Sequence, residues 1–194
     1  MKQHLIGLYS SSMQSGKSTV SLMLTEHLFG IKLAFAEPFY DFVVSVAAPF
    51  IGSEQEARAW LRDERKDKAL IPELGVTLRS MLQTIGTNWG RQCVHTNVWT
   101  MLAEKRALKA LKSYGVIFDD MRFPNEFDMI KRNGGRCVRI IRPGPARGDT
   151  QIAEGLLDNH EFDFTIYNNG TLDDLKLNVS YVANDILRTD AWKS

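Results

Sequence analysis

The segment at residues 10–19, with the sequence SSSMQSGKST, constrains the fold more than any other part of this chain. It follows an apolar run at 5–9 that has the length of a buried strand, and it precedes apolar residues at helical spacing. A strand, a loop of small residues, Gly-Lys-Ser and a helix together form the pattern of a phosphate-binding loop. The sequence therefore predicts an anion site where this helix begins.

The residue types in this loop suit a phosphate for separate physical reasons. Small residues let successive backbone N–H groups turn toward one anion, and the helix adds the positive end of its dipole. Lys17 adds a mobile cation, and Ser18 offers a hydroxyl to Mg²⁺. The residues predicted to hold the phosphates are Met13, Gln14, Ser15, Gly16, Lys17, Ser18 and Thr19.

One position departs from the phosphate-loop pattern. Ser11 stands where the pattern has its first glycine, and serine tolerates unusual backbone angles less well than glycine. The alternative interpretation is an ordinary strand-to-helix turn whose Lys17 is solvated.

The composition of the chain limits the kinds of partner that we expect for this protein. A chain of 194 residues suits one α/β domain, and a net charge of +1 gives no general polyanion-binding surface, so we expect neither nucleic acid nor a membrane as partner. No apolar run approaches membrane-spanning length. Cys93 and Cys137 lack metal-ligand spacing and no signal peptide is visible, so we expect free thiols and a cytoplasmic protein.

Apolar runs alternate with helical patterns along the chain. Besides the run at 5–9, they lie at 31–36, 114–118, 136–142 and 164–167. This alternation predicts an α/β fold with a five-stranded parallel sheet and helices on both faces, in a single domain over 1–194.

The region between the second and third strands is predicted to be helical. Pro72 is expected to open a helix that Gly86 ends, and a further long helix reaches about Leu111. The charged segment at 52–67 indicates an exposed helix with ion pairs, or alternatively an arm over the active site.

Charged residues follow three of the predicted strands. Glu37 lies between a strand end and a helix, where open α/β sheets bind ligands, although the helix dipole alone would also favour a carboxylate there. Asp119 and Asp120 resemble the Mg²⁺-side carboxylate of phosphate-loop enzymes, or alternatively cap a helix. Arg142 leads into a segment at about 143–160 that is rich in Pro, Gly and charge and long enough to form a lid.

Two side chains on the predicted helix near residue 80 share one face. Arg79 and Gln83 are four residues apart, and Arg91 follows shortly after. A guanidinium can clamp a phosphate through two parallel hydrogen bonds, and an amide can bind the edge of a base. The alternative is that all three are surface residues on a solvated helix.

Several stretches together resemble the phage-type deoxynucleoside monophosphate kinases, within the nucleoside-kinase branch of P-loop proteins. They are residues 15–19, 35–38, 78–87, Arg91, 97–99, 120–126 and 166–172. The blocks at 79–86 and 120–126 are the specific parts, because the phosphate loop alone would name only a superfamily.

The resemblance implies transfer of the γ-phosphoryl group of ATP, with Mg²⁺, to a deoxynucleoside 5′-monophosphate. It implies a P-loop kinase architecture with a helical acceptor-binding insertion at about 38–111 and a lid at about 143–160. The residues expected to bind the acceptor are Glu37, Arg79, Gln83, Arg91, Trp99 and Asp120; those expected to act on the transferred group are Lys17, Arg122 and Arg142; Ser18 and Asp119 are expected to hold the metal. A homodimer, and the host cytoplasm if the chain is phage-encoded, are implied by the resemblance alone.

Two other functions stay open at this stage. Another small-acceptor kinase, such as a dephospho-coenzyme A kinase, would need a carboxylate base for its hydroxyl acceptor, and Glu37 or Asp119 could serve. The second is a nucleotide-binding module without kinase activity. The chain also lacks the serine that family members often carry between His160 and Glu161, so we assign no role to that pair.

Overall fold

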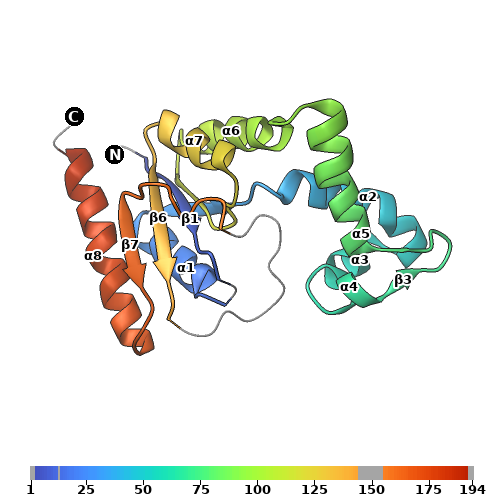
Figure 1. Ribbon diagram of the computed structural model, residues 1–194, viewed down its shortest axis with the longest axis horizontal. Helices are drawn as coiled ribbons and strands as arrows, with labels where there is room; N and C mark the ends of the chain where they lie inside the picture. The colour runs from blue at the N-terminus through green and yellow to red at the C-terminus, as the bar shows by residue number, and fades with distance from the viewer. Residues whose placement is uncertain (1–2, 13, 144–154, 192–194) are drawn as a thin grey trace. The chain divides into compact units, whose positions relative to one another are not determined.

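The computed structural model describes residues 3–12, 14–143 and 155–191 of the chain. The chain forms two compact units (Figure 1). The sheet unit comprises Met1–Phe35 and Ala103–Ser194, and the helical unit comprises Ala36–Leu102.

Five parallel strands form the centre of the sheet unit, in the order β2-β5-β1-β6-β7. They are β1 (Leu5–Tyr9), β2 (Gly30–Leu33), β5 (Gly115–Phe118), β6 (Arg136–Ile141) and β7 (Phe164–Tyr167). Every neighbouring pair in this sheet runs parallel. The predicted five-stranded parallel sheet is therefore confirmed, although β2 ends at Leu33 and not at residue 36.

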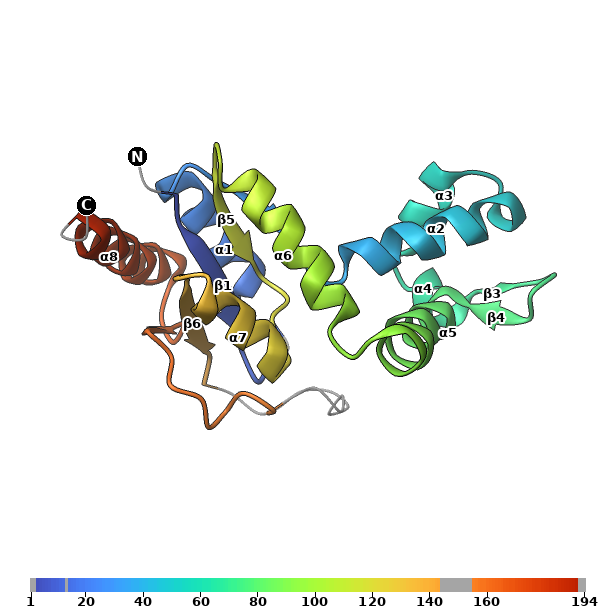
Figure 2. The ribbon, with the colours of Figure 1, turned by 90° about the horizontal axis from the view of Figure 1, so that it is seen from above.

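Helices cover both faces of this sheet (Figure 2). On one face, α1 (Lys17–His27) and α8 (Leu172–Ala191) pack in a cluster with Ile6, Leu8 and Val138. On the other face, α7 (Pro124–Arg132) and the C-terminal half of α6 (Val98–Ala110) pack in a cluster with Leu5, Val116 and Phe118. Because β1 and β5 are buried on both sides, their sequences are almost wholly apolar.

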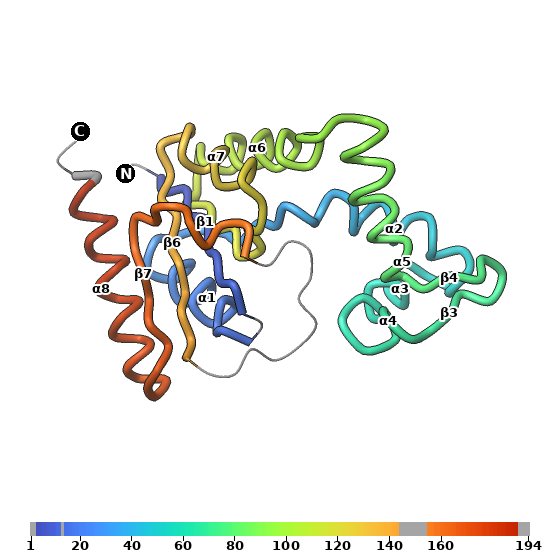
Figure 3. Tube along the Cα trace, viewed as in Figure 1, coloured from blue at the N-terminus to red at the C-terminus, as the bar shows by residue number. Residues whose placement is uncertain are grey.

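The parallel pairing puts the carboxyl ends of all five strands at one edge of the sheet. β1, β6 and β7 can be followed side by side along the Cα trace (Figure 3). The loop at 10–16 leaves β1 at this edge, Asp119 follows β5, Arg142 follows β6 and Asn168 follows β7. This edge is where open α/β sheets bind their ligands.

The helical unit is built from short elements. They are α2 (Glu37–Ile51), α3 (Glu54–Trp60), α4 (Arg65–Lys68), β3 (Leu70–Ile71), β4 (Val76–Thr77), α5 (Leu78–Gln83), the π-helix η1 (Thr84–Val94) and the beginning of α6. A cluster of Val43, Ala47, Ile71, Leu78 and Leu82 forms its principal buried core.

The prediction that Pro72 opens a helix is wrong. β3 and β4 pair antiparallel, with Ile71 opposite Val76, and the residues between them form a turn. Gly75 closes this turn with φ +63°, a conformation that glycine adopts without steric cost. The helix begins at Leu78, where the hydroxyl of Thr77 caps it by accepting from Ser80 N at 3.2 Å.

Gly86 does not end the helix, contrary to the prediction, because the chain continues as the π-helix η1. The indole Nε1 of Trp99 donates to Gly86 O at 2.8 Å. A Cβ at Gly90 would lie 2.5 Å from the Trp99 ring, so only glycine fits there. A side chain that binds a helix carbonyl and packs against the backbone is a recognised cause of local widening.

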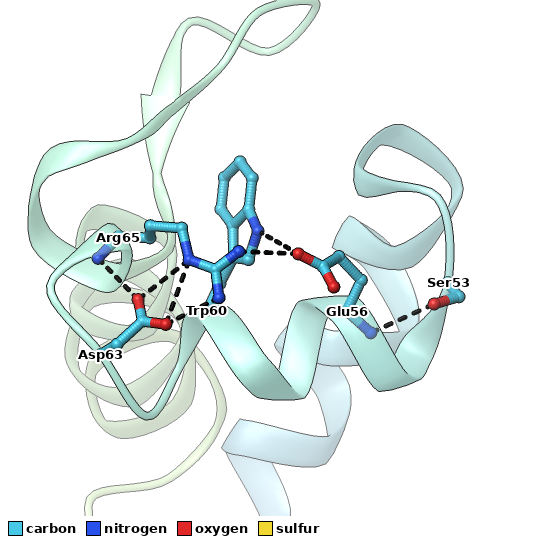
Figure 4. A network of polar contacts seen from close by, with 5 residues as sticks. All are labelled: Ser53, Glu56, Trp60, Asp63 and Arg65. Carbon is cyan, nitrogen blue, oxygen red and sulfur yellow. Dashed lines mark hydrogen bonds and ion pairs between the residues drawn. The ribbon is translucent and has the colours of Figure 1, made fainter.

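The charged segment forms two short helices with a break at 61–64, and the expected ion pairs are present (Figure 4). Ser53 Oγ accepts from Glu56 N at 3.1 Å and begins α3. Arg65 Nη1 donates to Glu56 Oε1 at 2.7 Å, and its Nη2 donates to Asp63 Oδ2 at 2.7 Å. Trp60 Nε1 shares the same Glu56 oxygen at 3.0 Å. The hydrogen bonds that the Asp63 carboxylate accepts from the side chain and the backbone N–H of Arg65 lower the pKa of Asp63.

The predicted lid falls mostly on residues 144–154, outside the described part of the chain. The described part resumes at Gly155, and Leu157 is fully buried in the sheet unit, so the C-terminal end of this segment contributes to the core. Tyr9 Oη donates to Asp158 Oδ1 at 2.8 Å. Burial and then this bond raise the pKa of Tyr9 to about 12.

Candidate functional site

The loop between β1 and α1 has the geometry of an anion-binding turn. Gly16 has φ +94° and Gln14 has φ +56°, and α1 begins at the next residue, Lys17. Such alternation of backbone conformations directs successive N–H groups to one side. The Ser15 side chain is 2% exposed, and its Oγ has no hydrogen-bond partner among the described residues. A loop with these backbone angles, and with a buried hydroxyl that has no partner among the described residues, fits a phosphate group.

The two charged or hydroxyl side chains predicted for this loop lie at its helix end. Lys17 Nζ donates to Ser10 O at 3.4 Å, so the ammonium lies within the loop. Ser18 is exposed in the first turn of α1, as is Thr19. Met13, also predicted for this site, lies outside the described residues.

Two side chains from neighbouring strand ends contact the loop backbone. Arg142 Nη1 donates to Gln14 O at 2.9 Å, and Asn168 Nδ2 donates to Ser15 O at 2.9 Å. Arg142 was predicted as a site residue, whereas Asn168 was not, although it lies in the stretch 166–172 that carries the family resemblance. The alternation of side chains along a strand could have indicated the face on which Asn168 lies. Ile166 is buried against α1 and α8, and Asn168 lies two residues further on, on the same face.

The two aspartates after β5 make different contacts. Asp119 Oδ2 lies 2.5 Å from Lys32 Nζ, and the Asp119 side chain is 10% exposed. Asp120 Oδ1 accepts from Phe35 N at 3.0 Å. Asp119 and the Ser18 hydroxyl are hard oxygen donors of the kind that Mg²⁺ takes together with phosphates and water. Within the described ranges, no group of three or more His, Cys, Asp or Glu side chains could hold a metal ion by itself.

The backbone around Arg122 is fixed by a buried carboxylate. Glu126 is 3% exposed, and its Oε2 accepts from Arg122 N at 2.8 Å and from Phe123 N at 3.1 Å. This is the contact that a glutamate at the third helical position makes in a capping box. The turn before α7 is thereby fixed, while the Arg122 side chain is exposed.

The predicted acceptor residues all lie in the helical unit except Asp120. Arg79 and Gln83 lie one turn apart on α5, and Arg79 Nε donates to Asp67 Oδ1 at 2.6 Å. This bond to Arg79 lowers the pKa of Asp67. Arg91 is half-buried on η1, and Glu37 is the half-buried first residue of α2.

Trp99 is 5% exposed and belongs to an aromatic cluster. Its ring centroid lies 5.1 Å from that of Phe39 and 6.3 Å from that of Trp89. Trp89 is 44% exposed and stacks on Phe42 at 5.8 Å between centroids. Trp99 therefore packs against η1. The exposed Phe42–Trp89 pair was not predicted from the sequence.

Both cysteines, Cys93 and Cys137, are free, as predicted. The described helices include none with the length and apolar character needed to span a bilayer.

Comparison with known proteins gives a consistent family match. The family model for deoxynucleotide monophosphate kinase matches residues 50–179. A protein of Acanthamoeba polyphaga mimivirus, named for the same activity, is 30% identical over 181 residues, which cover 88% of this chain and 91% of that protein. The deoxynucleoside-5′-monophosphate kinase of Escherichia phage T5 is 38% identical over 71 residues, which cover 37% of this chain and 28% of that protein.

Among solved structures, a dephospho-CoA kinase from Campylobacter jejuni superposes with a TM-score of 0.49 at 12% identity, over 96% of this chain and 98% of that chain. A similarity this distant carries no conclusion about function.

Proposed function

The chain belongs to the deoxynucleotide monophosphate kinase family, and we propose that it transfers the γ-phosphoryl group of ATP to a deoxynucleoside 5′-monophosphate. The observation that carries this proposal is the family match over residues 50–179. That range begins after the phosphate loop, so the match and the loop geometry are independent supports. The product is the diphosphate, a precursor for DNA synthesis.

In this proposal the loop of the sheet unit holds the phosphates of ATP. The positive φ of Gly16, the unpartnered hydroxyl of Ser15 and the position of Lys17 within the loop support this assignment. Backbone amides and a lysine at a helix N-terminus neutralise phosphate charge without any proton transfer.

The acceptor needs little chemical activation. A monophosphate oxygen is already a competent nucleophile, so the protein has to position two nucleotides and stabilise the charge of the transferred group. Bound Mg²⁺ would neutralise phosphate charge, and Ser18 and Asp119 are the residues that would hold it. We assign Arg122 and Arg142, with Lys17, to the transferred phosphoryl group, and the segment at about 143–160 to a lid that excludes water.

The acceptor is assigned to the helical unit. Arg79 and Arg91 would clamp its phosphate, because a guanidinium offers two parallel donors. The contact with Asp67 supports the assignment of Arg79. The hydrogen bond from Nε to Asp67 fixes the plane of the guanidinium and leaves its two Nη groups for a ligand. Gln83, with a donor and an acceptor, would bind the base edge. Glu37 and Trp99, together with Asp120 of the sheet unit, complete the predicted set.

The test is a panel of acceptors with ATP and Mg²⁺, measured by coupled release of ADP. The panel contains dAMP, dGMP, dCMP, dTMP, hydroxymethyl-dCMP, the ribonucleotides and dephospho-coenzyme A. We expect ADP release that depends on at least one deoxynucleotide. Release with dephospho-coenzyme A alone would instead identify the other kinase, and release no greater than that of a Lys17→Ala control with every acceptor would overturn the proposal.

We also propose that the partners are small-molecule nucleotides and neither nucleic acid nor a membrane. The viral sources of the named relatives support the host cytoplasm as the place of action. The homodimer stays a prediction, which sedimentation equilibrium of the purified chain tests directly.

A further inference from the structure

We propose that Asn168 is a positioning residue that holds the phosphate loop in its anion-binding form from behind, with Arg142 holding the adjacent peptide. The proposal rests on the proposed function, because it assigns the loop to the phosphates of ATP. In this role Asn168 contacts the carbonyl side of the loop and reaches no ligand.

The planarity of the peptide group couples the direction of each carbonyl to that of the following amide. In a trans peptide the C=O and the N–H point in opposite directions. Asn168 Nδ2 binds Ser15 O at 2.9 Å, so the N–H of Gly16, which belongs to the same peptide, is directed away from Asn168. Arg142 Nη1 binds Gln14 O at 2.9 Å and fixes the N–H of Ser15 in the same way, while the other donors of this guanidinium remain for the phosphoryl group assigned to it above. Two consecutive amides of the loop are therefore oriented by donors on their carbonyl sides.

These two amides are available to a ligand. Among the described residues, neither Ser15 N nor Gly16 N donates a hydrogen bond to another backbone group. In the same loop, Gly16 O accepts from Val20 N at 3.0 Å and so joins the loop directly to the first turn of α1. An amide that is held in place before the ligand arrives binds it without a further loss of backbone entropy.

The strand that precedes Asn168 explains why its side chain reaches the loop. Asn168 N donates to Ile141 O at 2.8 Å, which extends the β6–β7 ladder by one residue and fixes the backbone. Because side chains alternate along a strand, Asn168 lies on the same face as Ile166, the face covered by α1 and α8. The N-terminus of α1 is where the phosphate loop ends.

The chemistry of the contact requires an amide donor. A carboxylate at this position could only accept, and it would place a negative oxygen against Ser15 O. Space is equally restricted, because a Cβ at Gly16 would lie 2.6 Å from Asn168 Nδ2. Gly16 is therefore favoured by its φ of +94°, and a side chain at this position would also displace the Asn168 amide from Ser15 O.

The experiment compares Asn168→Asp and Asn168→Ala with the matched control Asn169→Asp. Asn169 is exposed, and its substitution by aspartate introduces the same charge one residue further along the chain. Dissociation constants are measured by calorimetry for ATP and for inorganic tripolyphosphate, which has no base or sugar. We expect Asn168→Asp to raise the dissociation constants of both ligands by about 10- to 100-fold, and Asn168→Ala to raise them by about 5- to 30-fold. In the control variant both dissociation constants should change by less than about threefold.

Kinetics separate positioning from a general loss of structure. We expect kcat/KM for ATP to fall in the Asn168 variants while KM for the deoxynucleotide stays within about twofold, and circular dichroism to show an unchanged fold. Unchanged affinity for tripolyphosphate in both variants would overturn the proposal. A loss for ATP without a loss for tripolyphosphate would show that Asn168 contacts the nucleoside instead.

The outcomes also separate this proposal from the proposed function. If the wild-type protein binds tripolyphosphate but phosphorylates no deoxynucleotide, the proposed function fails and the calorimetric comparison still decides the role of Asn168. If the wild-type protein releases ADP with a deoxynucleotide but does not bind tripolyphosphate, the proposed function stands and the role given to Asn168 in holding a phosphate site is overturned. If Asn168→Asp does not fold, the uncharged Asn168→Ala variant decides.

Discussion

The sheet unit and the helical unit are stabilised by different kinds of contact. In the sheet unit two apolar clusters cover the two faces of the sheet, and a loop at the strand ends is fixed through its backbone carbonyls. In the helical unit the core is smaller, and exposed ion pairs and half-exposed aromatic rings connect short elements. The part assigned to the triphosphate is thus fixed by its backbone, whereas the part assigned to the acceptor depends on individual side chains.

This difference predicts that the largest loss of activity comes from a single cation in the sheet unit. Lys17→Ala removes the ammonium that lies within the loop while the core stays intact, so we expect turnover to fall by about 10³-fold with an unchanged thermal midpoint. ADP release at saturating substrates measures it. Turnover within tenfold of wild type would contradict the assignment of the loop.

A smaller and more selective loss is expected in the helical unit. Arg79→Lys and Arg91→Lys keep the charge but lose the two parallel donors, so KM for the deoxynucleotide should rise by about 10- to 50-fold. The dissociation constant for ATP, measured by calorimetry, should change less than twofold. If both variants keep the wild-type KM for every monophosphate, the acceptor site lies elsewhere and the contrast between the units fails.

The aromatic cluster gives a third comparison. Trp99→Phe removes the indole donor to Gly86 O and the contact of the larger ring with Gly90, which should cost about 1–2 kcal/mol of unfolding free energy. The exposed neighbour Trp89→Phe is the matched control, with less than about 0.5 kcal/mol expected. Urea unfolding measures both. Equal losses in the two variants would contradict the role given to Trp99 beneath η1.

The smallest effect expected is in the sheet unit, at Tyr9. Tyr9→Phe removes the hydrogen bond to Asp158 and should cost about 1 kcal/mol at pH 8. The folded pKa is raised from 10.0 to about 12, so this contribution is present below pH 10 and is lost as the pH rises toward 12. Urea unfolding at pH 8 and pH 11 should therefore show a smaller difference between variant and wild type at the higher pH.

The sheet unit could be predicted largely from sequence because its determinants are local. A strand buried on both faces is an apolar run, and the phosphate loop is one contiguous segment, so β1, β5 and the start of α1 could all be recognised. For Asn168, strand alternation from Ile166 indicates only the face of the sheet on which the side chain lies. Its partner Ser15 is 153 positions away, and no local pattern identifies that contact.

The helical unit was predicted less well because its determinants compete. Pro72 is compatible with both a helix start and a turn, and the pairing of Ile71 with Val76 decides for the turn. Gly86 suggested a helix end, but Trp99, 13 positions later, binds its carbonyl and the helix continues. In both cases a tertiary contact overrides the local preference.

The π-helix η1 also makes the number of residues in this segment a determinant of geometry. A π-turn contains about one residue more than an α-turn, so deleting one residue between Gly86 and Arg91 would let the chain wind as an ordinary α-helix. Five residues of a π-helix and four residues of an α-helix cover nearly the same angle about the axis, so Arg91 would keep its direction after such a deletion. A second deletion has no extra residue to remove, and it would turn every later side chain by about 100° around the helix axis. In this family, the loss of one residue within the segment should therefore alter acceptor binding less than the loss of two.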